Sequence, residues 1–150
     1  MNSRSSAGVA QDAVDSPNLG ELELFFPAGL LGFPASRRYK LDRFKPGEGT
    51  ESPFFLLTAL DEDLSFPLVH PDTIALEYQF PANSELLQLL RATSGEQLVP
   101  LLIMTVRERL DQTTLNLQGP VIVNPLACLG VQLVLEQYPL RHPLFTSVSL

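Results

Sequence analysis

The sequence predicts an all-β protein, a small barrel-like domain of about eight short strands with one short helix. Three observations lead to this prediction: apolar and polar residues alternate with period two, thirteen prolines and nine glycines interrupt the chain, and 45% of the 150 residues are apolar. Proline and glycine disfavour the interior of helices, while an apolar fraction of this size can form a core. Many short strands are typical of a barrel or a sandwich.

Two kinds of segment mark the predicted strands. Successive side chains of a strand point to opposite faces of a sheet, so alternation indicates a strand with one buried face. The alternation is clearest where one face would carry Ile74, Leu76, Tyr78 and Phe80. The alternating segments are 21–26, 38–42 and 73–80. The segments rich in apolar or β-branched residues, which predict the remaining strands, are 53–60, 98–106, 113–117, 120–124 and 131–137.

The one predicted helix covers residues 83–92. Asn83 or Ser84 can cap its start, and Glu85 in the first turn is favourable for the helix dipole. Helical spacing places three leucines on one face, which predicts that this face is buried. They are Leu86, Leu87 and Leu90.

The chain has a predicted tail and one distinctive turn. Residues 1–19 are rich in Ser, Ala and Asp and contain no aromatic residue. We therefore expect a disordered N-terminal tail before a domain at 20–150. Gly29 and Gly32, in the run Phe-Pro-Ala-Gly-Leu-Leu-Gly-Phe, are expected to form a turn with positive φ angles.

The sequence gives no sign of a membrane or secreted protein. No apolar run approaches the roughly 18 residues of a membrane helix, and no basic start followed by an apolar stretch marks a secretory signal. The single cysteine, Cys128, leaves no internal disulfide, and its apolar neighbours predict a buried thiol of ordinary reactivity. We expect a cytoplasmic protein.

The net charge of −7 disfavours a nucleic-acid-binding protein, whose affinity comes largely from Lys and Arg. The imbalance lies in the middle of the chain, because residues 46–90 contain no Lys or Arg and eight carboxylates. Two interpretations remain open: a solubilising face, or a docking surface for a basic protein, where complementary charge speeds and selects the encounter.

One basic cluster runs against this trend. The alternation with Tyr39 and Leu41 places its basic side chains on the outer face of a strand. We interpret it as an edge strand whose charges discourage edge-to-edge pairing rather than as a nucleic-acid site. The cluster consists of Arg37, Arg38, Lys40, Arg43 and Lys45.

No catalytic or metal-binding set is visible in the sequence. The two histidines, His70 and His142, are far apart, and only Asp72 lies close to one of them. This is too little for a typical zinc site, and the sequence also lacks a phosphate loop and a nucleophile elbow. We expect no metal, no cofactor and no enzyme activity. A small-molecule-binding barrel or an unrecognised enzyme remains the alternative.

Three segments resemble the flagellar assembly factor FliW family. The first is Phe26-Pro-Ala-Gly-Leu-Leu-Gly-Phe33, and the second is Pro53-Phe-Phe-Leu-Leu57 with Leu64-Ser-Phe66. The third is the most specific: Thr114-Leu-Asn-Leu117, Pro120-Val-Ile-Val-Asn124 and Val131-Gln-Leu-Val-Leu135, with Tyr138 and Arg141-His142. The resemblance spans about 21–145. Pro67 interrupts the second segment and predicts an edge or a bulge there.

The resemblance implies a binding protein for flagellum biogenesis. FliW-type proteins bind CsrA, an RNA-binding repressor of flagellin translation, and they also bind flagellin. Flagellin and CsrA then compete for one chaperone-like factor, which relieves repression when flagellin has been exported. On this basis we expect CsrA and flagellin as partners, no direct contact with nucleic acid or membrane, and a monomer when free.

The family motifs themselves are expected to specify the fold. Gly32 fits a turn, Phe33 a core anchor and Asn124 the end of a strand, while Asn116 needs a polar partner. The CsrA surface is instead predicted within 46–90. Its residues are Asp61, Glu62 and Asp63 in a turn between two strands, with Asp72 and the solvent-facing Glu77.

Overall fold

The computed structural model describes Leu19, residues 21–43 and residues 53–144. Its eight strands are short, with one exception of 11 residues. The strands are β1 (Glu21–Phe25), β2 (Arg38–Arg43), β3 (Phe54–Ala59), β4 (Ser65–Val69), β5 (Val99–Thr105), β6 (Thr114–Asn124), β7 (Leu129–Gln132) and β8 (His142–Pro143). The helical elements are η2 (Pro71–Ile74), α2 (Ser84–Leu89), η3 (Gly95–Gln97) and η4 (Leu110–Gln112).

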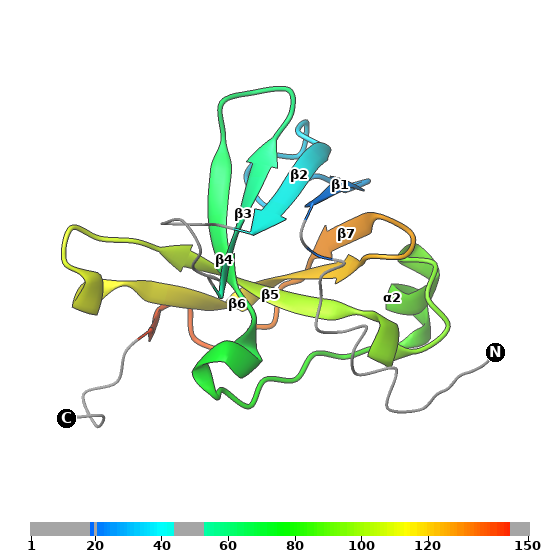
Figure 1. Cartoon of the computed structure of the whole chain (residues 1–150). Helices are drawn as coiled ribbons and strands as arrows, with labels where there is room; N and C mark the ends of the chain where they lie inside the picture. The colour runs from blue at the N-terminus through cyan, green and yellow to red at the C-terminus, as the bar shows by residue number, and fades with distance from the viewer. Residues whose placement is uncertain (1–18, 20, 44–52, 145–150) are drawn as a thin grey trace.

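Seven of the strands close into a barrel, which confirms the predicted fold class (Figure 1). The order is β5-β4-β3-β2-β1-β7-β6, and pairing of β5 with β6 closes the ring. The strands pair antiparallel except β1 and β7, which meet in parallel only at Phe25 and Leu129. β8 is added to the outer edge of β6. Closure reduces the exposed sheet edges that promote aggregation.

The interior of the barrel is filled by apolar side chains from alternate positions of the strands. Leu24, Tyr39 and Leu57 are at most 2% exposed and belong to one buried cluster. Phe26 fills the space above Gly130, where an added Cβ would lie 2.5 Å from the Phe26 ring. The glycine is therefore required by close packing.

Two further apolar clusters lie on the outside of the barrel. On one side, Leu76 and Tyr78 pack against residues of β5 and β6. On the other side, α2 packs Leu86 and Leu90 against the outer face of β6 and β7. The helix lies within the predicted range 83–92, and its predicted cap is confirmed because Asn83 Oδ1 accepts the backbone N–H of Leu86 at 2.9 Å.

The clearest alternating segment is not a strand, which corrects one prediction. Residues 73–80 begin in η2 and continue as extended chain without a ladder. The burial pattern still alternates, since Leu76, Tyr78 and Phe80 are half-buried and their neighbours are exposed. Alternation here reports an extended chain lying on the barrel, not one paired within a sheet.

The basic strand is not an edge strand, which corrects a second prediction. β2 lies between β1 and β3, where Leu41 pairs with both Leu22 and Leu57. Pro67, in contrast, does lie at a local edge: β4 pairs with β5 only at Leu68 and Val69. Lys45 and residues 1–18 lie outside the described residues, whereas Leu19 is buried in the core.

Several local features agree only in part with the expectations from the sequence. Gly29 and Gly32 have φ angles of 68° and 88°, as predicted. Phe33 is not a core anchor; it is 37% exposed and meets the ring of Phe66 edge-on. Cys128 is half-buried rather than fully buried. The strands predicted at 113–117 and 120–124 are one continuous strand, β6.

Candidate functional site

The five predicted binding residues fall into two separate groups. Asp61, Glu62 and Asp63 occupy the turn between β3 and β4, as predicted, at the tip of a hairpin that projects from the barrel (Figure 1). Asp72 and Glu77 follow the other end of β4. The structure therefore does not bring all five together, because the length of β4 separates the two groups.

The hairpin tip carries an ion pair that sequence reasoning missed. Arg38 donates to Asp61 with Nη2–Oδ1 at 2.8 Å, and both side chains are more than half exposed. The hydrogen bond from Arg38 lowers the pKa of Asp61, and the carboxylate raises the pKa of Arg38. The net charge of these four side chains is therefore −2: three carboxylates and one guanidinium.

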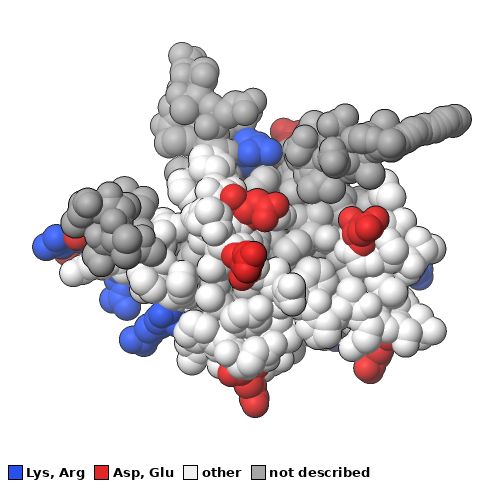
Figure 2. Space-filling view, turned by 90° about the horizontal axis from the view of Figure 1, so that it is seen from below, with Lys and Arg blue, Asp and Glu red and all other residues white. Residues whose placement is uncertain are grey.

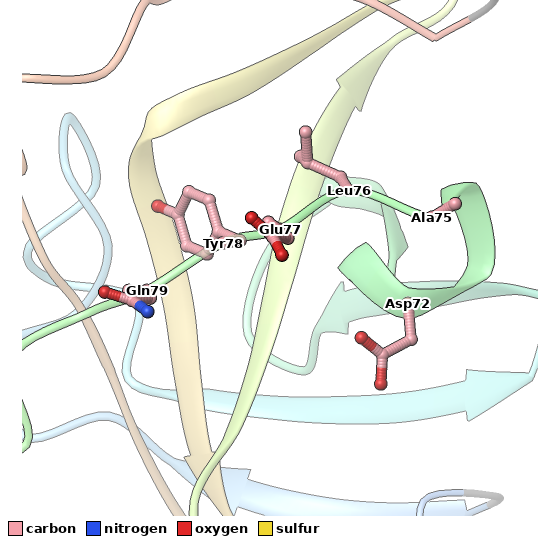
Figure 3. Close-up of a pocket in the computed structure, with 6 residues that line it drawn as sticks. All are labelled: Asp72, Ala75, Leu76, Glu77, Tyr78 and Gln79. Atoms are coloured by element: carbon pink, nitrogen blue, oxygen red, sulfur yellow. The ribbon is translucent and has the colours of Figure 1, made fainter.

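The second group lies along an open groove beside the extended segment 75–82 (Figure 3). One hollow of about 490 Å³ includes Asp72, Leu76 and Glu77 in its lining. A second hollow of about 570 Å³ shares Tyr78 and Gln79 with the first and extends to Glu96. We call these two adjoining hollows the 72–82 groove.

Two tyrosines fix the extended segment that lines the groove. Tyr78 and Tyr138 stack with ring centroids 4.6 Å apart. The Tyr78 hydroxyl donates to the Leu117 carbonyl on β6, and burial raises the pKa of Tyr78. The Tyr138 hydroxyl accepts the N–H of Gln79 at 3.1 Å and donates to its carbonyl at 3.2 Å. The segment is thus held by side chains where a sheet would use backbone pairs.

At the other end of the groove, a histidine side chain caps the short helix η2. His70 Nδ1 accepts the backbone N–H of Asp72 at 3.0 Å and so starts η2. Burial lowers the pKa of His70, while the Asp72 carboxylate, 3.9 Å away, opposes this shift. Within the described residues no three His, Cys, Asp or Glu side chains are grouped to hold a metal ion.

The charges on the groove side are dispersed. Figure 2 views the molecule from below and shows acidic side chains as separate groups on a mainly uncharged surface; basic groups are visible mainly at the left, with others near the top and at the right edge. A protein that binds this face would therefore contact both charged and uncharged surface.

No helix in the part of the chain that the structure describes is long and apolar enough to cross a membrane.

These features define a class: a small closed β-barrel with an apolar interior and with groups of exposed carboxylates on a hairpin tip and along a surface groove. The family model described as FliW protein matches residues 10–144. The chain belongs to the FliW family of flagellar assembly factors, a family of assembly proteins rather than a class of enzymes. The match includes residues 10–19, which we had expected to lie outside the family resemblance.

Curated relatives and a solved structure agree with this assignment. The flagellar assembly factor FliW of Natranaerobius thermophilus is 37% identical over 142 residues, covering 88% of this chain and 91% of the relative. FliW of Caldicellulosiruptor saccharolyticus is 33% identical, covering 94% and 95%. A crystal structure of the flagellar assembly factor FliW superposes with a TM-score of 0.73 at 27% identity, covering 83% of this chain and 86% of that one.

Proposed function

We propose that this flagellar assembly factor binds the translational repressor CsrA and flagellin in a cytoplasmic partner switch. Free factor binds CsrA and relieves its repression of flagellin mRNA. Accumulating flagellin occupies the factor and returns CsrA to its target. The switch requires only that the two ligands compete for one protein, so it needs no catalytic group.

The observation that carries the proposal is the distribution of charge. Residues 46–90 contain eight carboxylates and no Lys or Arg. Of these, Glu62, Asp63 and Glu77 are exposed and make no ion pair within the described chain. Such a surface suits a partner with a basic RNA-binding face, because complementary charge raises the association rate and excludes wrong partners.

The alternative, a small-molecule-binding barrel or an unrecognised enzyme, has less support. A barrel that binds a small ligand keeps a cavity inside, whereas the interior here is occupied by side chains such as Phe26, Tyr39 and Leu101, all fully buried.

The test is a capture experiment followed by competition. Tagged protein is used to recover partners from the cytoplasm of its own organism, and purified CsrA and flagellin are then titrated against it. We expect both to bind, and flagellin to release CsrA from a preformed complex. Recovery of neither partner, or binding of both at once without mutual effect, would contradict the partner switch.

A further inference from the structure

The segment Leu76–Phe80 has the side-chain pattern of a strand but pairs with none of the strands that the structure describes. Leu76 and Tyr78 pack against the cluster on the outer face of β5 and β6, and Phe80 packs in the cluster under α2. Glu77 and Gln79 are exposed on the opposite side. Figure 3 shows this chain crossing the barrel strands as an extended ribbon.

The backbone of this segment is only partly hydrogen-bonded within the described chain. In an extended chain, the N–H and C=O groups of successive residues point to opposite edges. On one edge, the Tyr138 hydroxyl binds both groups of Gln79, whereas the Glu77 backbone makes no hydrogen bond among the described residues. On the other edge, the Pro71 carbonyl accepts the Leu76 N–H, while the N–H and C=O groups of Tyr78 and Phe80 make no hydrogen bond within the described part of the chain. An unpaired edge of this kind is a template for another strand.

The groove beside this segment has space and a single sign of charge. Its two hollows meet at Tyr78 and Gln79. Three carboxylates line it, and no Lys or Arg does. Among the described residues none of the three pairs with a Lys or Arg. The carboxylates are Asp72, Glu77 and Glu96.

We propose that the 72–82 groove binds an extended, basic segment of a protein partner, which adds as a β-strand along Leu76–Phe80. Backbone hydrogen bonds to Tyr78 and Phe80 give such a strand its register, and alternate side chains of the strand reach the carboxylates. The inference rests on the proposed function, since CsrA is the basic partner. It also gives a role to a strand-like pattern in a segment that pairs with no strand in the described part of its own chain.

Backbone amide exchange of the full chain, alone and saturated with CsrA, tests strand addition directly. We expect exchange at the Tyr78 and Phe80 amides to slow by about tenfold or more in the complex, because each gains a hydrogen bond that must open before exchange. The Gln79 amide, already bonded to Tyr138, should change less. If the complex forms and the Tyr78 and Phe80 amides exchange as fast as in the free protein, strand addition is wrong although CsrA binding stands. If no complex forms, both proposals fall.

Charge-reversal variants test the groove as the docking site independently, and they include a matched control. Glu77→Lys should weaken CsrA binding by about tenfold, because it places like charges together at the contact. Glu21→Lys makes the same change at an exposed site on β1, outside the groove, and should leave affinity within about twofold if only screened surface charge is altered. Equal unfolding midpoints would show that both variants fold. Equal affinities of the two variants would overturn the groove as the docking site.

Discussion

At the scale of single residues, two asparagines of β6 use their amide groups differently: Asn116 accepts through Oδ1, whereas Asn124 donates through Nδ2 and also accepts the Leu126 N–H through Oδ1 at 3.1 Å. Asn116 Oδ1 accepts the backbone N–H groups of Gln118 and Gly119, at 3.0 and 2.9 Å. Asn124 Nδ2 donates to the carbonyl of Leu90 at 2.7 Å, and this side chain is 2% exposed. The polar partners of Asn116 and the strand end at Asn124 were predicted. The Leu90 contact was not, because it joins positions 34 residues apart.

The same substitution should therefore lower the free energy of unfolding by different amounts at the two sites. Asn116→Asp keeps both accepted hydrogen bonds, so we expect the free energy of unfolding to fall by less than about 1 kcal/mol. Asn124→Asp leaves the Leu90 carbonyl without a donor and buries a carboxylate, which should cost about 3 kcal/mol or more. Urea unfolding at neutral pH measures both. Equal losses would show that these bonds do not determine stability at the two sites.

At the scale of elements, the sequence predicted most strands and the helix but not how one segment is used. Period-two alternation reports which side chains are buried, and in 73–80 it did so correctly. It carries no information on whether the backbone is paired, and here Tyr138 takes the place of a neighbouring strand. The ion pair between Arg38 and Asp61 was equally hidden, because it depends on the pairing of β2 with β3.

The cap of η2 makes stability depend on pH. His70 Nδ1 must be unprotonated to accept the Asp72 N–H, and burial lowers the pKa of His70. Below about pH 6.5 the unfolded chain takes up a proton that the folded protein resists, so stability is lost as pH falls. His70→Asn keeps an accepting cap without titrating, and should show a smaller loss of unfolding free energy between pH 7 and pH 5.

Asp72→Asn provides a control of opposite sign for this effect. The Asp72 carboxylate raises the pKa of His70 and so partly offsets burial. Its removal should steepen the loss of stability toward pH 5, measured by urea unfolding at both pH values. If wild type, His70→Asn and Asp72→Asn share one pH dependence, His70 does not control this range.

At the scale of the whole molecule, closure of the barrel determines where the carboxylates lie on the surface. The excess of carboxylates in 46–90 could be predicted from the sequence, as could the exposure of those that the structure describes. Their division between the hairpin tip and the 72–82 groove could not, since it follows from the direction of β4 within the closed sheet. On the proposed function, the two acidic groups at opposite ends of β4 would act as a steering surface and a docking surface for a basic partner.

The hairpin tip should act mainly through the rate of association. Asp61→Asn, Glu62→Gln and Asp63→Asn together change the local charge, with Arg38 included, from −2 to +1. We expect association with CsrA at low salt to slow by about threefold to tenfold and to depend less on salt, because steering is a long-range effect. Flagellin binding should change less if its contacts are mainly apolar. The fold should persist, since these side chains are exposed.

A variant with the same net charge separates steering at the tip from a general effect of charge. Glu21→Gln, Glu108→Gln and Glu136→Gln also remove three exposed carboxylates, all outside the tip and the groove. Stopped-flow association rates over a range of salt concentrations compare the two triple variants. A local steering surface predicts a clearly slower rate only for the tip variant, with the two rates converging as salt screens the charges. If both variants slow association equally, net charge alone is responsible. If neither does, the acidic tip is a solubilising turn.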